Sequence, residues 1–150
     1  MANLIQLMYI SRSTFVPTIP SNAINPHVAR ILMEARASNK KTGLVGVLYF
    51  GDDCFFQCLE GDEEAVMALY AKLLKDPRHK DLKIISTKPI DVKWFLQWNM
   101  KYVPLEKNMT QLLEAHGHKT FDPYRFSPEM TQSVLDLLHG ADEATQIALD

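Results

Sequence analysis

The stretch "FFQCLEG", residues 55–61, reads as a β-strand that is buried on both faces, because phenylalanine, cysteine and leucine occupy positions of both parities. Gln57 lies in the middle of this strand. Its carboxamide brings donors and an acceptor into the interior, and leaving them unpaired would cost roughly 1–3 kcal/mol. We therefore expect Gln57 to have a specific hydrogen-bond partner elsewhere in the chain or in a ligand.

The residues before this strand predict its hairpin partner and a helix. "LVGVLYF" (44–50) has a strand pattern, and "GDD" (51–53) supplies the turn. Upstream, Asn25 followed by Pro26 is typical of a helix start, and Gly43 marks the helix end. Apolar residues repeat between them at i, i+3, i+4 and i+7, namely Val28, Ile31, Leu32 and Ala35.

The residues after it predict a second helix and further strands. We expect Asp62 to cap this helix, with Glu63 and Glu64 in its first turn at the positive end of the helix dipole. Its apolar stripe consists of Val66, Leu69, Tyr70, Leu73 and Leu74. Three more segments have strand patterns, "LIQLMYI" (4–10), "LKIISTKPI" (82–90) and "LQWNMKYV" (96–103).

The resulting order is β-α-β-β-α-β followed by a fifth strand, which indicates an α+β, ferredoxin-like sheet with two helices on one face. Weaker helical patterns follow at 108–116 and 128–139. This C-terminal part has too small a core to fold alone. We therefore expect a core domain at 1–103 and a helical extension at 104–150 that packs on the sheet or on a partner.

Composition narrows the class of protein. The chain has 150 residues, enough for one domain with a core of its own, and its net charge of -2 argues against a nucleic-acid surface. It contains no run of 18 apolar residues and no basic region ahead of the first strand, so we expect neither a membrane span nor a secretion signal. Cys54 and Cys58 are too far apart along a strand to form a disulfide, which favours a reducing cytoplasm.

Polar residues within apolar segments are the candidates for function. Strand alternation puts Tyr9 on the face of Ile5 and Leu7, and Gln57 on the face of Phe55. Tyr9 and Gln57 either bond each other or a backbone group, or both bond a polar ligand between the helices. Asn39 either terminates the first helix or binds a ligand, and the alternating pair of Trp98 and Met100 is most often simple core.

Taken together, these segments resemble the BLUF family of blue-light sensors that use FAD, in its short single-domain form. The resemblance covers residues 4 to about 103. It rests on "LMYIS", "ASNKKTGLVGVLYF", "FFQCLEG", "LYAKLLKDPRHKDLKII" and "FLQWNMKYV", in which tyrosine, asparagine, glutamine and Trp-x-Met fall on the expected elements in order. Asn99 departs from the serine or histidine often found inside Trp-x-Met, which bears on signalling rather than on flavin binding.

The resemblance implies roles for individual residues. Tyr9 matches the photoactive tyrosine, Gln57 the glutamine that links it to the flavin, and Asn39 the asparagine at the pyrimidine edge of the ring. Other matches are Ile31 and Leu73 on the helices that sandwich the ring, Arg78 and His79 near its outer end, and Trp98 and Met100 as the mobile pair of the fifth strand. Lys72 is either a charge near the FAD phosphates or part of a solvated helix surface.

The resemblance also implies a mechanism. Blue light would excite FAD, Tyr9 would supply an electron and a proton, and recombination would leave the Gln57 amide rearranged and the flavin absorption shifted to the red. No substrate is consumed, so we expect no enzymatic activity. The signal would pass through the fifth strand and the C-terminal helices to a downstream protein, without nucleic acid or membrane, and the chain could form homo-oligomers.

Three alternatives share parts of this pattern. An RNA-recognition domain has the same element order but needs a basic sheet, and an acylphosphatase-type enzyme needs a glycine-rich phosphate loop near Arg12; the sequence has neither. His116 and His118 alone do not make a structural zinc site. A light-independent FAD-binding redox or interaction module stays open, because the same pocket would serve it.

Overall fold

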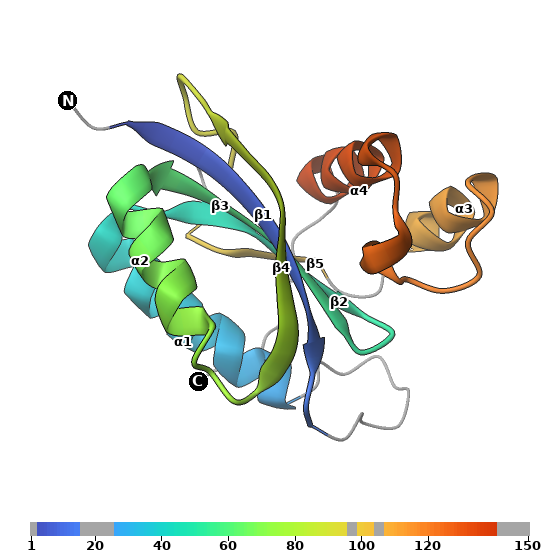
Figure 1. The fold of residues 1–150 in the computed structure, drawn as a ribbon, viewed down its shortest axis with the longest axis horizontal. Helices are drawn as coiled ribbons and strands as arrows, with labels where there is room; N and C mark the ends of the chain where they lie inside the picture. Colours follow the sequence, from blue (N-terminus) through green and yellow to red (C-terminus); the bar gives the residue numbers. More distant parts are fainter. Residues whose placement is uncertain (1–2, 16–25, 96–98, 104–106, 141–150) are drawn as a thin grey trace.

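The protein is seen here in a computed structural model that describes residues 3–15, 26–95, 99–103 and 107–140. The fold consists of five strands with helices on both sides of them (Figure 1). In chain order the elements are β1 (Leu4–Ser13), α1 (Pro26–Thr42), β2 (Val45–Gly51), β3 (Cys54–Asp62), α2 (Glu63–Leu73), β4 (His79–Pro89), β5 (Lys101–Val103), α3 (Lys107–Ala115), the 3-10 turn η1 (Pro123–Arg125) and α4 (Pro128–Gly140).

The strands form one sheet in the order β4-β1-β3-β2-β5. β1, β3, β2 and β4 pair antiparallel, whereas β5 lies parallel to β2. The predicted ferredoxin-like arrangement with an added fifth strand is therefore confirmed. In this register Tyr9 stands directly opposite Gln57, at the centre of the β1–β3 pair.

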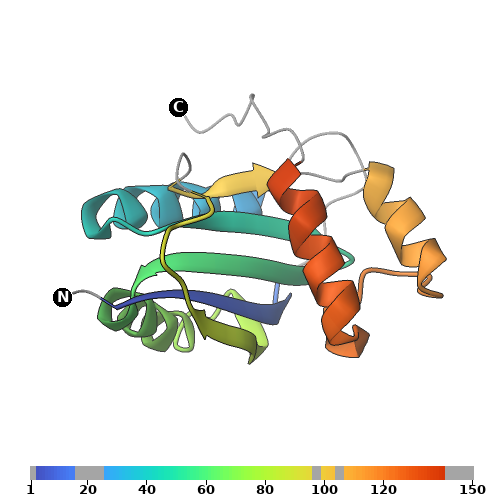
Figure 2. The ribbon, with the colours of Figure 1, turned by 90° about the horizontal axis from the view of Figure 1, so that it is seen from above.

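Helices cover both faces of the sheet. α1 and α2 pack on one face, and α3 and α4 lie on the other, as the two perpendicular views show (Figures 1 and 2). One apolar cluster joins α1 and α2 to side chains such as Leu7, Leu48 and Leu59. A second cluster joins α3 and α4 to Ile10 and Phe56. Every residue of β3 up to Gly61 is consequently buried, which confirms the reading of this strand as two-faced.

The hairpin and the end of α1 depend on particular backbone positions. Asp52 and Asp53 take positive φ angles of 48° and 64° in the turn between β2 and β3, a conformation that aspartate tolerates better than most residues. Gly43 ends α1 with a φ of 75°. Gly46 lets β3 approach closely, because a Cβ there would lie 1.9 Å from the carbonyl oxygen of Cys58. The aspartates of the turn and the glycine of β2 are thus residues that the geometry of the hairpin favours.

Two predictions about single elements need correction. Asp62 is the N-cap residue of α2, but its side chain makes no capping hydrogen bond. The backbone N–H of Glu63, the first helical residue, donates to the carbonyl oxygen of Asn3. The last strand is shorter than 96–103: it begins at Lys101, and residues 96–98 lie outside the described part of the chain. The carbonyls of Asn99 and Met100 accept hydrogen bonds from side chains of α1.

The C-terminal helices α3 and α4 pack on the sheet. Met109 and Leu113 of α3 and Val134, Leu135 and Leu138 of α4 belong to the same buried cluster as β2 and β3. Within the described ranges, no helix has both the length and the apolar character that crossing a membrane requires.

Candidate functional site

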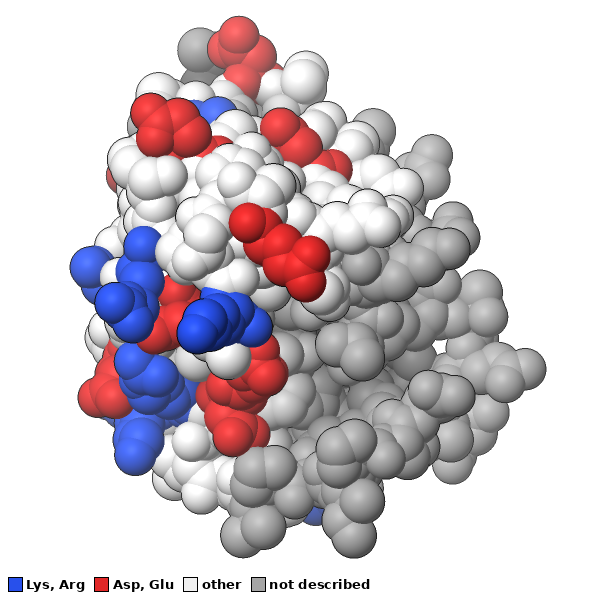
Figure 3. All heavy atoms as spheres, turned by 90° about the vertical axis from the view of Figure 1, so that its right-hand side faces the viewer, with Lys and Arg blue, Asp and Glu red and all other residues white. Residues whose placement is uncertain are grey.

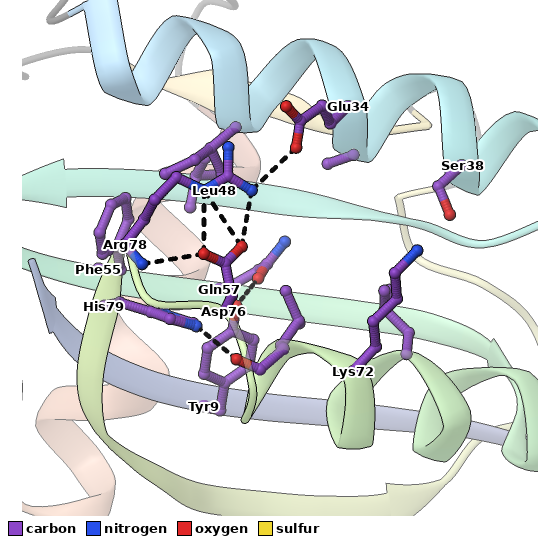
Figure 4. Close-up of a pocket in the computed structure, with 14 residues that line it drawn as sticks. Tyr9, Glu34, Ser38, Leu48, Phe55, Gln57, Lys72, Asp76, Arg78 and His79 are labelled. Carbon is purple, nitrogen blue, oxygen red and sulfur yellow. Dashed lines mark hydrogen bonds and ion pairs between the residues drawn. The ribbon is translucent and has the colours of Figure 1, made fainter.

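A pocket lies between α1, α2 and the central strands (Figure 4). Its empty space, the open mouth included, is about 730 Å³. Its inner end is formed by Tyr9, Leu48, Phe55 and Gln57, and its outer end by polar residues of α1, α2 and the start of β4. An apolar body with a few polar groups at its ends suits a flat aromatic ligand with a charged tail.

Tyr9 and Gln57 form the polar centre of the inner end. The Tyr9 hydroxyl donates a hydrogen bond to Gln57 Oε1, and both side chains are buried, with 3% and 5% of their surface exposed. Burial raises the pKa of Tyr9 far above its ordinary value, with smaller contributions from Tyr70 and Asp76. The phenol is therefore neutral throughout the physiological range and keeps its proton for donation.

The other end of the Gln57 amide faces Met100. Gln57 Nε2 donates to Met100 Sδ over 3.7 Å. The glutamine thus connects Tyr9 of β1 to Met100, the residue that precedes β5. Both ends of the Gln57 amide therefore have a hydrogen-bond partner within the chain. A thioether sulfur is a weak acceptor, so this second bond is the easier of the two to break.

Asn39 is fully buried at the end of α1 and has one unused polar atom. Its Nδ2 donates to the carbonyl oxygen of Asn99 over 2.6 Å, whereas its buried Oδ1 has no hydrogen-bond partner in the described structure. An acceptor left unpaired in the interior costs roughly 1–3 kcal/mol. Helix termination alone does not explain it, and a ligand N–H beside α1 would satisfy it.

Ion pairs cross the mouth of the pocket. Arg78, just before β4, contacts Asp76 at 2.6 Å and Glu34 of α1 at 2.8 Å (Figure 4). The hydrogen bond from Arg78 lowers the pKa of Asp76, and the same bond raises the pKa of Arg78. The guanidinium thereby links α1 to the turn that follows α2, at the outer end of the cavity.

His79 is held on both ring nitrogens. Nδ1 lies 2.9 Å from Ser11 Oγ, and Nε2 lies 2.8 Å from the carbonyl oxygen of Leu73. Its ring is 6.3 Å from that of Tyr9 and nearly perpendicular to it. His79 therefore joins β1, α2 and β4 at the edge of the pocket and limits how far this edge can open.

The structure brings most of the predicted site residues to one place. The pocket is lined by Tyr9, Ile31, Gln57, Lys72, Leu73, Arg78 and His79. Met100 reaches it through Gln57, and Asn39 lies at the end of the α1 helix that covers it. Trp98 falls outside the described residues.

Sequence reasoning did not identify the acidic partners of Arg78. Asp76 stands two residues before Arg78 in "KDPRHKD", and this spacing was the available signal. Glu34 had no such signal, because its contact with Arg78 depends on the packing of α1. Among the described residues, no three His, Cys, Asp or Glu side chains gather in a way that could hold a metal ion, so His116 and His118 are not part of such a group.

Known proteins are similar to this chain in sequence. The model of the BLUF family, described as sensors of blue light using FAD, matches residues 4–101. Photoactivated adenylate cyclase subunit beta of Euglena gracilis is 32% identical over 99 residues, and subunit alpha of the same organism is 33% identical over 96. These matches cover 66% and 64% of this chain. The chain spans only 11% and 9% of the length of these two relatives.

Solved structures are similar over nearly the whole chain. BlsA in its photo-activated state is 34% identical, with a TM-score of 0.84 over 95% of this chain and 99% of that one. BlrB, a BLUF protein solved in the dark state, is 26% identical, with a TM-score of 0.67 over 93% of this chain and 97% of that one. The similarity to these two therefore includes the region of α3 and α4 as well as the sheet.

Proposed function

This chain belongs to the BLUF family, sensors of blue light that use FAD, and from that premise we propose that the pocket between α1 and α2 holds the flavin ring beside Tyr9 and Gln57. The observation that carries the proposal is the buried chain of hydrogen bonds from Tyr9 through Gln57 to Met100. It lies at the inner end of a cavity that is open to ligand at its outer end.

The residues present fit this cofactor. The unpartnered, buried Oδ1 of Asn39 is an acceptor for a ring N–H, and Ile31 and Leu73 face the cavity from α1 and α2 as the two apolar walls of a flat group. Arg78 and Lys72 place cations at the outer end, which suits the phosphates. His79 borders the same space. We assign all these residues to FAD binding, with Met100 acting through Gln57.

The response to light starts at the Tyr9 hydroxyl. FAD bound here would supply the absorption of blue light and the acceptor for an electron from Tyr9. Tyr9 passes its hydroxyl proton to Gln57 Oε1, the atom that already accepts its hydrogen bond. Proton and electron then return to Tyr9, so nothing is consumed, and the lasting change is the orientation of the Gln57 amide.

Rotation of this amide has a consequence for Met100. A carboxamide has a donor end and an acceptor end, and rotation exchanges them. The end that now donates to Met100 Sδ would become an oxygen, which cannot donate, so this hydrogen bond would be lost. Met100 would be released, and the altered hydrogen bonding around the ring would shift its absorption to the red.

We propose that the signal leaves through β5 and the C-terminal helices to a partner protein. Figure 3 looks onto the right-hand side of Figure 1, where α3 and α4 lie; uncharged side chains make up most of the described surface in this view, and Lys and Arg gather on its left. This supports a protein partner more than a nucleic acid. Residues 1–103 would act as the sensor and 104–150 as the output segment, without catalysis of their own. A second copy of the chain is the alternative partner.

The test is the absorption spectrum of the FAD-loaded protein in the dark and after blue light. A flavin band that moves to the red and relaxes in the dark supports the proposal. A flavin band that stays in place would leave a light-independent FAD-binding module, the alternative that uses the same pocket. A protein that takes up no FAD would contradict both.

A further inference from the structure

Side chains of α1 hold the backbone that carries Met100. Asn99 and Met100 precede β5 and have no place in its ladder with β2, which begins at Lys101. Their carbonyl oxygens accept hydrogen bonds from α1 instead: Asn39 Nδ2 donates to Asn99 over 2.6 Å, and Arg36 Nε donates to Met100 over 3.0 Å. The position of the Met100 sulfur against Gln57 therefore depends on α1, and Arg36 holds Met100 directly by bonding its carbonyl oxygen.

The next residue along the chain points to the opposite face. Lys101 pairs with Val47 of the α4-side cluster, whereas Met100 belongs to the cluster beneath α1 and α2. Lys101 is 1% exposed, and its Nζ donates over 2.7 Å to the carbonyl oxygen of His139, in the last turn of α4. A cation at this end of a helix is favoured by the helix dipole, and a buried ammonium requires such a partner.

The end of α4 has a second attachment that does not involve β5. The His139 ring stacks on Trp94 with centroids 3.8 Å apart and an interplanar angle of 8°. The backbone N–H groups of Trp94 and Phe95 donate to Glu60 Oε1 at 2.7 and 2.8 Å, and Glu60 is a buried residue of β3. This attachment is anchored in the centre of the sheet, so a movement of Lys101 would change the hydrogen bonding of the last turn of α4 while the ring of His139 stays in place.

We infer that Arg36 and Lys101 are positioning residues of the light response. Arg36 holds Met100 against Gln57, and Lys101 passes any displacement of Met100 through the sheet to the last turn of α4. The role in signalling rests on the proposed function, since light is what would move Met100. The mechanical coupling from Arg36 to α4 exists in the dark as well, and it can be tested without any photochemistry.

The experiment compares dark-state amide hydrogen exchange of residues 128–140 in the full, FAD-loaded chain. The variants are Arg36→Met, which removes the donor to Met100, and Arg30→Met, an exposed arginine on the same helix, as the matched control. Arg36→Lys tests rescue by a cation. We expect exchange in the last turn of α4 to rise roughly fivefold or more in Arg36→Met, to stay at the wild-type rate in Arg30→Met, and to be partly restored in Arg36→Lys.

Exchange in Arg36→Met at the rate of the Arg30→Met control would overturn the inference, because an arginine that merely stabilised α1 would have no effect on the far face of the sheet.

Lys101→Met tests the coupling from the other end, with the exposed Lys88→Met as its control. Lys101→Met should change the dark recovery time of the flavin and abolish the light-dependent change in α4 exchange. If the dark recovery time and the light-dependent change in α4 amide exchange of Lys101→Met equal those of wild type, Lys101 has no coupling role. A wild-type protein without a red shift would contradict the proposed function, while the dark comparison would still decide this inference.

Discussion

Tyr9 and Gln57 stand opposite each other in the antiparallel pair of β1 and β3, and the Tyr9 hydroxyl donates to Gln57 Oε1. A cross-strand pair of this kind is fixed by the register of the sheet, so neither residue needs a loop to place it. The donor and the acceptor of this bond are thus held by two adjacent interior strands of the sheet. Movement is left to the weaker contact between Gln57 and Met100.

Replacing Gln57 with leucine should abolish the red shift. Leucine fills similar space but offers no donor or acceptor, so light can rearrange nothing, and the Tyr9 hydroxyl loses its acceptor at a cost of roughly 1–3 kcal/mol in stability. Gln6→Leu is the matched control, because Gln6 is also a buried glutamine of the sheet but bonds Glu60. Light-minus-dark difference spectra should show the red shift in Gln6→Leu and not in Gln57→Leu. A shift of wild-type size in Gln57→Leu would exclude the Gln57 amide as the group that light rearranges.

Replacing Asn39 with leucine should weaken FAD binding. The variant loses the buried Oδ1, which has no hydrogen-bond partner among the described residues, together with the bond to Asn99. Loss of one hydrogen bond of about 1.4 kcal/mol corresponds to a roughly tenfold higher Kd for FAD, which fluorescence titration can measure. An unchanged Kd would mean that Asn39 serves only to end α1 and to hold Asn99.

Arg78→Gln should also lower the affinity for FAD. The guanidinium lies at the mouth of the pocket, where it joins Asp76 to Glu34 and where the cofactor phosphates are expected. We expect a Kd roughly tenfold higher, since bonds to charged groups contribute about 1.5–3 kcal/mol. Lys75→Gln, at an exposed position on the turn after α2, removes the same charge outside the pocket and should bind normally. If both variants bind FAD with equal affinity, Arg78 does not contribute to FAD binding and serves only in its ion pairs with Asp76 and Glu34.

Alkaline pH should destabilise the fold through its buried tyrosines. Burial raises the pKa of Tyr102 to about 12, whereas an unfolded tyrosine titrates near 10. The neutral phenol is favoured in the fold, so its contribution is complete below pH 10 and is lost as the pH rises from 10 to 12. Urea unfolding at pH 8 and pH 11 should therefore show a larger loss in wild type than in Tyr102→Phe. Equal losses would show that Tyr102 is not responsible.

Much of the fold was predictable because its signals are local. The stripe of α1 and the turn at Asp52 and Asp53 follow from periodicity and turn chemistry. The bond between Tyr9 and Gln57 was only one of the alternatives that the sequence left open, because the two residues lie 48 positions apart on different strands. The roles of Arg36 and Lys101 were not predictable, because each side chain donates to a backbone carbonyl far away in sequence. Arg36 bonds Met100, and Lys101 bonds His139 at the end of α4. The length of β5 was misjudged for the same reason: a strand pattern in "LQWNMKYV" does not reveal that side chains replace the ladder at Asn99 and Met100.

The most direct test of the central claim is the light-minus-dark absorption spectrum of FAD-loaded Tyr9→Phe beside that of Tyr70→Phe. Tyr70 is the matched control, because its ring lies 5.5 Å from that of Tyr9 and is also buried. The account predicts that both variants bind FAD, that Tyr70→Phe keeps the reversible red shift, and that Tyr9→Phe loses it. A red shift of wild-type size in Tyr9→Phe would contradict the assignment of Tyr9 as the source of the electron and proton.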